Sequence, residues 1–186
     1  MIIEYTLTKQ DLFEFNFFVG WASPEKRNFR IKYYLKSFLS SLLTVFLILI
    51  IGNKKVTIDM ILTFICLGLI IGFLGAHVGI YSNYKRKIER FLDDPSNSSF
   101  YTRTQLILSD SGIVNREESS ETHYDWNAII KKTETKDYIY LFLSSIQGIV
   151  IPKKTLNEKE KSELIEILSR NIPLIAEFNK EYFRLS

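Results

Sequence analysis

The sequence predicts an α+β membrane protein, in which a two-helix transmembrane hairpin is joined to a small antiparallel β domain closed by a C-terminal α-helix. The hairpin is indicated by two apolar runs, residues 33–51 and 56–81, each near the roughly 20 residues that cross a hydrocarbon core. Only Gly52 to Lys55 separate the two runs, which leaves room for a tight turn. The β domain is indicated by β-branched and aromatic runs between turn residues in the segment 100–151.

Four consecutive segments follow from this pattern. We expect an N-terminal cytoplasmic strand and helix (1–32), the hairpin (33–81), a basic helix with a polar linker (82–99), and the cytoplasmic β domain (100–186). The N-terminal strand covers residues 2–8. Thr8 and Asp11 then have the spacing of a capping box, which predicts the start of a short helix.

Turn residues divide the β domain into consecutive strands. The expected strands are 103–109, 113–116, 124–135, 138–144 and 146–151, with an acidic turn at 117–121. Pro152 ends the last strand, and a capping box of Asn157 and Glu160 begins a helix over 157–171. The apolar stripe of this helix predicts that it covers the sheet; its members are Leu164, Ile165, Leu168 and Ile172. A short amphipathic segment, 174–185, follows.

Basic residues flank both apolar runs at the ends away from the connecting turn. They are Lys26, Arg27, Arg30, Lys32 and Lys36 before the first run, and Lys85, Arg86, Lys87 and Arg90 after the second. The turn itself carries only Lys54 and Lys55. The positive-inside rule therefore predicts a multi-pass protein of the cell membrane with both termini in the cytoplasm. Because these flanking basic residues lie next to the bilayer, we also expect all of them except Lys36 to contact its anionic lipid headgroups. The first 32 residues lack the pattern of a cleavable signal peptide.

Both apolar runs carry a stripe of small residues. The second run has Gly68, Gly72, Gly75, Ala76 and Gly79 on one helix face, and the first has Ser37, Ser40, Ser41 and Thr44. Small residues allow the backbones of membrane helices to approach closely. Because an antiparallel hairpin brings the two stripes together, we interpret them as its packing surface. A contact between copies in a homo-oligomer is the alternative.

Little in the sequence indicates catalysis. The single cysteine, Cys66, lies in the second apolar run and excludes disulfides within the chain and cysteine-based zinc sites. His123 lies beside an acidic turn that we expect to be solvated, so we predict no metal. No nucleophile with a base and an orienting group stands out, and no glycine-rich phosphate loop is present. We therefore expect no cofactor and no enzymatic activity. The slightly acidic segment after residue 93 argues against nucleic-acid binding.

Particular motifs of the β domain resemble the YcxB-like family of bacterial membrane proteins. They are Tyr124-Asp125-Trp126-Asn127-Ala128-Ile129, residues 132–141, the turn Ile151-Pro152-Lys153-Lys154, and the opening Tyr5-Thr6-Leu7-Thr8. The resemblance implies a pleckstrin-homology-like sheet closed by a C-terminal helix. It also implies that Trp126, Ile129 and Pro152 belong to the family signature or to the core of this domain. It implies no catalytic residues.

Two functional hypotheses follow. The first is a membrane-anchored cytoplasmic interaction module that binds a protein partner, still unknown, or the membrane surface, through an exposed strand edge for example. The second is an immunity protein that neutralises a membrane-active bacterial toxin by contact within the membrane. An outward-facing glycine stripe would favour the second hypothesis.

Overall fold

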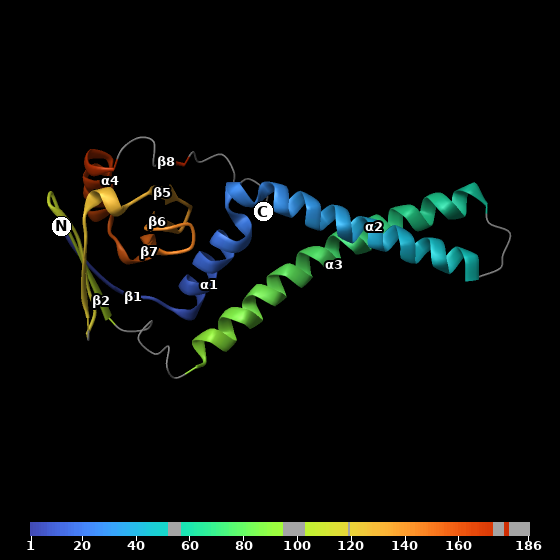
Figure 1. Cartoon of the computed structure of the whole chain (residues 1–186), viewed down its shortest axis with the longest axis horizontal. Helices are drawn as coiled ribbons and strands as arrows, with labels where there is room; N and C mark the ends of the chain where they lie inside the picture. The colour runs from blue at the N-terminus through green and yellow to red at the C-terminus, as the bar shows by residue number, and fades with distance from the viewer. Residues whose placement is uncertain (52–56, 95–102, 119, 173–176, 179–186) are drawn as a thin grey trace. The chain divides into compact units, whose positions relative to one another are not determined.

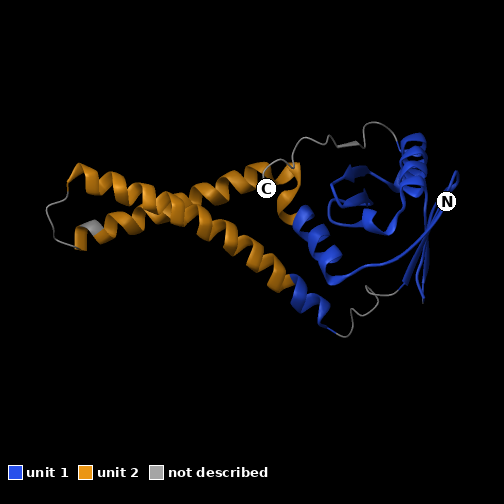
Figure 2. Cartoon of the chain, turned by 180° about the vertical axis from the view of Figure 1, so that it is seen from behind, with its two compact units in different colours: residues 1–19, 88–186 blue, residues 20–87 orange. Residues whose placement is uncertain are grey.

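The computed structural model describes residues 1–51, 57–94, 103–118, 120–172 and 177–178, with only the backbone of Leu49, Glu177 and Phe178 (Figure 1). Small antiparallel sheets and long apolar helices make up a mixed α+β fold, as the sequence predicts. The chain divides into two compact units (Figure 2). Unit 1 comprises residues 1–19 and 88–186, and unit 2 comprises residues 20–87.

The first sheet of unit 1 is an antiparallel four-stranded sheet in the order β1-β2-β3-β4. Its strands are β1 (Ile2–Thr6), β2 (Arg103–Ser109), β3 (Gly112–Arg116) and β4 (Glu121–Tyr124). β1 and β2 are paired along their length, from Ile2 opposite Ile107 to Thr6 opposite Arg103. Both apolar helices therefore lie in the connection between two neighbouring strands of one sheet.

The second sheet has the order β7-β6-β5-β8. It contains β5 (Lys131–Glu134), β6 (Tyr138–Phe142), β7 (Gly148–Pro152) and the two-residue β8 (Glu177–Phe178), which runs parallel to β5. The rest of the expected amphipathic segment 174–185 lies outside the described residues.

One expected strand, 124–135, is wrong. The chain leaves the first sheet after Tyr124, forms a 3₁₀ turn (η4, Trp126–Ala128), and enters the second sheet at Lys131. The Trp126 indole donates a hydrogen bond to the Ser109 carbonyl (3.0 Å), so this segment packs on the first sheet where the strand would otherwise continue. The expected acidic turn, 117–121, also ends one residue too late, because Glu121 is already the first residue of β4 and lies opposite Arg116.

The main core of unit 1 lies between the two sheets and α4 (Glu158–Asn171). Leu106, Leu141, Ile151 and Leu164 are completely excluded from solvent there. The capping box of Asn157 and Glu160 is present at the start of α4, as predicted. Ile165 differs from the predicted stripe: it is 45% exposed, because Leu164 and Leu168 take the buried face of the helix.

An aromatic layer covers the other face of the second sheet. Tyr140 and Phe142 of β6 lie against Phe15 and Phe18 at the end of α1 (Lys9–Phe17), with ring centroids 5.2–6.1 Å apart. All five residues of β6 are therefore buried. A strand covered on both faces is apolar throughout and does not alternate with polar residues.

Unit 2 consists of one long apolar helix and most of a second, preceded by the end of η1 (Phe18–Ala22) and by η2 (Pro24–Lys26). α2 (Arg27–Ile51) begins before the expected span at residue 33, because no helix breaker follows Pro24. α3 (Ile58–Leu92) is one continuous helix that includes the expected basic helix after residue 81. Both helices are long and apolar enough to cross a membrane, with 0% and 6% of their most apolar stretches buried.

Candidate functional site

The two helices of unit 2 approach each other at the small residues. Ser37 Oγ donates a hydrogen bond to the Gly72 carbonyl (3.0 Å). A Cβ atom added at Gly72 would lie 2.9 Å from Ser41 Oγ, and one at Gly68 would lie 3.2 Å from Val45 Cγ2. The structure therefore brings Ser37 and Ser41 together with Gly68 and Gly72, where only glycine leaves room for the neighbouring helix.

The remaining small residues lie beside this contact. A Cβ atom added at Gly75 or Gly79 would meet nothing within 4 Å, although Ala76 between them is only 5% exposed. A groove of about 470 Å³ runs along this side of the helix pair. Its lining includes Ser40, Thr44 and Gly75, together with Tyr33, Lys36 and Ile71. The small-residue stripe thus divides into a part that contacts α2 and a part that faces open space.

Aromatic side chains gather near the start of α2. Trp21 is buried against Phe29, Tyr33 and Tyr34, with centroids 5.5–5.9 Å apart. Tyr34 stacks in turn on Phe73 of α3 (5.4 Å). This cluster provides a second contact between the two helices of unit 2. The spacing of residues in the sequence did not predict it.

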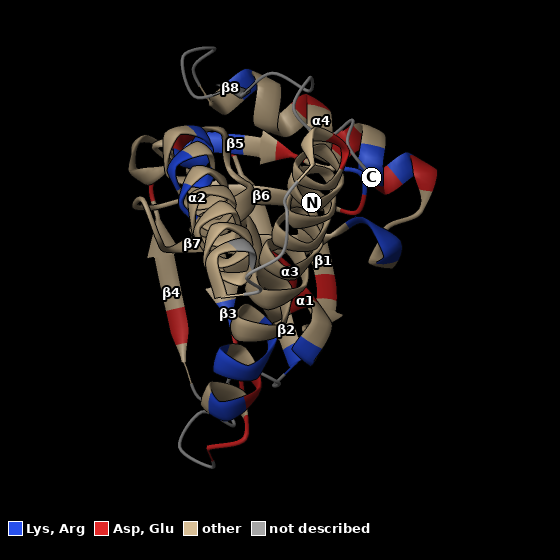
Figure 3. Cartoon of the chain, turned by 90° about the vertical axis from the view of Figure 1, so that its right-hand side faces the viewer, with Lys and Arg blue, Asp and Glu red and all other residues tan. Residues whose placement is uncertain are grey.

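The basic residues flanking the helices do not all remain available to a ligand. Arg30 donates hydrogen bonds to the carbonyl groups of Trp21 and Ser23, the latter at 2.7 Å. Arg86 donates to Ser82 and Asn83 of its own helix. The others are exposed at the start of α2 and the end of α3 (Figure 3): Lys26, Arg27, Lys32, Lys85, Lys87 and Arg90. Arg30 thus satisfies backbone carbonyls ahead of α2, a role that its charge alone did not predict.

Asp11 forms a buried polar contact within unit 1. Its carboxylate is completely excluded from solvent and accepts hydrogen bonds from the Thr8 backbone N–H (2.8 Å), the Tyr138 hydroxyl (2.9 Å) and Lys154 Nζ (2.7 Å). The capping box with Thr8 is present as predicted. Burial by itself raises the pKa of Asp11, but the hydrogen bonds from Lys154, Thr8 and Tyr138 outweigh it and hold the pKa below its usual value. Asp11 therefore joins α1 to β6 and to the turn after β7.

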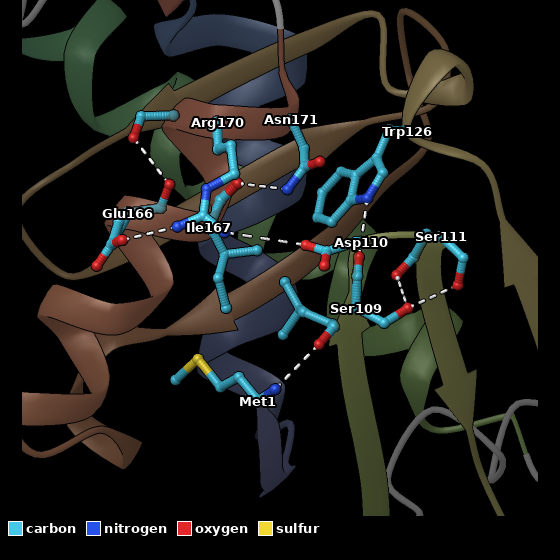
Figure 4. Close-up of polar contacts among 12 residues, drawn as sticks. Met1, Ser109, Asp110, Ser111, Trp126, Glu166, Ile167, Arg170 and Asn171 are labelled. Atoms are coloured by element: carbon cyan, nitrogen blue, oxygen red, sulfur yellow. Dashed lines mark hydrogen bonds and ion pairs between the residues drawn. The ribbon is translucent and has the colours of Figure 1, made fainter.

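The three residues of the family signature are all buried in unit 1. Trp126 is 8% exposed, Ile129 is 4% exposed, and Pro152 is fully buried opposite Tyr138. Figure 4 shows the Trp126 indole directed at the Ser109 carbonyl. The Met1 amino group donates a hydrogen bond to the carbonyl of the neighbouring Leu108 (3.0 Å). These residues hold the fold together, and their side chains are not presented to a ligand.

Charged side chains form a row across the outer face of the first sheet. Glu4 of β1 pairs with Arg103 and accepts a hydrogen bond from Gln105 (2.9 Å). Arg116 pairs with Glu121, which also contacts His123 Nε2 at 3.0 Å. The hydrogen bonds from Arg116 and His123 lower the pKa of Glu121. Among the described residues, His123 has this single carboxylate partner, and no group of three metal-ligating side chains occurs.

The fold and these contacts define a class: a two-sheet antiparallel domain with a closing helix, joined to a pair of long apolar helices. Within that class, the resemblance to the YcxB-like family is confirmed, because the family model described as YcxB-like protein matches residues 108–168, from the end of β2 into α4. No curated protein and no solved structure matches the chain.

Proposed function

We propose that this chain is a membrane-anchored cytoplasmic interaction module, whose YcxB-like domain binds a protein partner or the membrane surface. The observation that carries the proposal is the exposure of α2 and α3. Large apolar side chains are more than half exposed along both helices, including Leu43, Phe46, Leu62 and Phe73. Exposed apolar patches of this size mark interaction or membrane surfaces, and helices of this length suit a bilayer.

The pairing of β1 with β2 supports a hairpin topology. β1 precedes both apolar helices and β2 follows them, yet the two strands share a hydrogen-bonded ladder. Strands on opposite sides of a membrane cannot pair, so the chain between them crosses an even number of times. Together with the basic residues outside the spans, this supports the assignment of both termini to the cytoplasm.

The strand pattern of unit 1 supports a pleckstrin-homology-like fold for the module. Four antiparallel strands are followed by the three antiparallel strands β5 to β7 and then by α4. β4 lies at the edge of the first sheet, where Glu121, Thr122 and His123 are exposed. An exposed edge is a surface on which a partner strand adds to a sheet.

Thiol labelling of intact cells tests the topology. In a Cys66→Ser background, we expect an impermeant thiol reagent to modify Asn53→Cys, because the connecting turn lies outside the cell. Ser98→Cys is the matched control, and we expect it to be modified only after the cells are opened. Labelling of Ser98→Cys in intact cells, with protection of Asn53→Cys, contradicts the proposed topology.

The open part of the glycine stripe favours a second candidate function, the neutralisation of a membrane-active toxin. Gly75 and Gly79 face open space beside the helix contact, so a partner helix could approach there closely. A photo-crosslinking residue in place of Val78, which is 61% exposed, tests this in intact membranes. Attachment to a small membrane-active protein supports the second candidate. A partner attached only through unit 1 supports the interaction module.

A further inference from the structure

A cleft of about 410 Å³ lies in unit 1 and is lined by residues of that unit. Its walls are the turn between β5 and β6, the 3₁₀ turn η5 (Lys153–Thr155) and α4. Four lysines from these three elements line it: Lys136, Lys153, Lys154 and Lys161. Lys136, the adjacent pair Lys153 and Lys154, and Lys161 come from three separate elements, which the fold brings together.

Three of these ammonium groups are held in position by partners within unit 1. Lys153 Nζ donates to Glu134 Oε1 (2.8 Å) and to the Thr135 carbonyl (2.6 Å). Lys154 donates to Asp11, as described above, and Lys161 donates to Glu158 Oε1 (2.6 Å). Because an ammonium group has three N–H donors, each of the three retains at least one beyond these bonds. Groups that are already ordered lose less conformational entropy when a ligand binds.

Lys136 differs from the other three lysines. It is exposed on the β5–β6 turn and makes no hydrogen bond or ion pair with the residues that the structure describes. In the lining itself, the four lysines meet two carboxylates, Glu134 and Asp137. Two further carboxylates pair with the lysines from outside the lining: the wholly buried Asp11 binds Lys154, and Glu158, whose side chain is 90% exposed and screened by solvent, binds Lys161. The lining itself therefore holds four lysines against two carboxylates, and it offers N–H donors to a ligand.

An aliphatic side chain completes the lining. Ile165 is 45% exposed beside Lys161, whereas Leu164 and Leu168 of the same helix are buried. Burial of an exposed isoleucine by a ligand is favourable. A ligand that suits this lining combines carboxylates with one aliphatic group. A phosphate group fits less well, because it offers at most one O–H donor, whereas the backbone of an acidic peptide also supplies N–H donors to Glu134 and Asp137.

We propose that this cleft binds an acidic peptide segment of a protein partner, with its carboxylates on Lys136, Lys154 and Lys161 and one aliphatic side chain on Ile165. The inference rests on the proposed function, because it takes the partner of the module to be a protein. It gives that partner a recognisable chemistry, namely a short acidic segment that contains a leucine, isoleucine or valine.

The test uses the full chain in nanodiscs of uncharged phosphatidylcholine and a fluorescent peptide, Glu-Glu-Ile-Glu-Glu. We expect saturable binding by fluorescence anisotropy and about tenfold weaker binding by Lys136→Glu, since charge reversal turns an attraction into a repulsion. Lys159→Glu is the matched control: Lys159 is an exposed lysine of α4 outside the cleft, and we expect its replacement to leave binding unchanged. A peptide with glutamine in place of glutamate is expected not to bind.

Several results overturn the proposal. The acidic peptide does not bind, or it binds Lys136→Glu as tightly as the wild type. A third such result is an equal loss of peptide affinity in Lys136→Glu and Lys159→Glu, which indicates non-specific electrostatic attraction. Displacement by an equal concentration of pyrophosphate assigns the cleft to a phosphate ligand instead. Tighter binding to phosphatidylserine vesicles that depends on Lys136 assigns it to the membrane surface. Circular dichroism checks that each variant is folded. Thiol labelling of the hairpin does not depend on the cleft. If the peptide does not bind but the cysteines are labelled as expected, the cleft proposal is wrong and the membrane-anchored module is still supported.

Discussion

β6 and α3 are both rich in apolar residues, but their surroundings differ. Every residue of β6 is buried, whereas most large apolar side chains between Ile58 and Tyr81 of α3 are exposed. β6 lies between the main core and the aromatic layer of α1, while α3 meets α2 at Gly68, Gly72 and the Phe73 ring. Hydrophobicity therefore predicts that a segment avoids water, and the available neighbours decide what replaces the water. For α3 we propose that lipid does so.

The largest expected effect contrasts a leucine from each region. Leu141 in β6 is completely buried, and Leu74 in α3 is 55% exposed. We expect Leu141→Ala to lower the free energy of unfolding of unit 1 by roughly 2–5 kcal/mol, because it leaves a cavity. Leu74→Ala removes no such contact, and we expect almost no change. Urea unfolding in detergent micelles, followed by near-ultraviolet circular dichroism, measures both. A comparable loss in both variants would mean that the hairpin is packed as tightly as the core.

Asp11 is expected to give the next largest effect. Asp11→Asn removes the charge that Lys154, Thr8 and Tyr138 surround, and we expect a loss of about 1–3 kcal/mol in the free energy of unfolding at neutral pH. Because the folded-state pKa is lowered, the contribution of Asp11 is fully present above its unfolded pKa of about 3.9 and is lost as the pH falls through the folded value.

The pH dependence provides the control for Asp11. We expect the difference between wild type and Asp11→Asn to be constant from neutral pH down to about pH 5 and to shrink below about pH 4. A difference that persists unchanged at pH 2 would mean that shape, and not charge, accounts for the role of Asp11.

The remaining prediction, which concerns the helix contact alone, compares two glycines of α3. Gly72→Leu places a side chain where a Cβ atom alone approaches Ser41 to 2.9 Å, and we expect it to destabilise the helix contact by about 1–3 kcal/mol. Gly75→Leu enters open space and should leave the contact unchanged. The rate of disulfide formation between cysteines introduced at Val45 and Gly68, in a Cys66→Ser background, reports the contact in membranes. Equal losses in the two variants would indicate that an unseen partner fills the groove beside Gly75.

Local patterns in the sequence predicted the local structure well. The capping boxes at Thr8 and Asn157 are both present, because each depends on side chains three residues apart. The strand 103–109 was predicted as the structure has it, and the strand predicted over 138–144 is present at 138–142, since turn residues bound both. The sequence did not show that the expected strand 124–135 is interrupted at Trp126. The hydrogen bond from Trp126 to Ser109 joins residues that are 17 positions apart, beyond the reach of a local pattern.

The sequence by itself determined the presence of two long apolar helices, the positions of the helix caps and the resemblance to the YcxB-like family. Only the tertiary structure decided that β1 pairs with β2 across the whole hairpin, that Asp11 meets Tyr138 and Lys154, and that four lysines share one cleft. The physical reason is range. Caps and periodicity act within a few residues, whereas these contacts join groups up to 143 residues apart, which only the packing of the two sheets brings together.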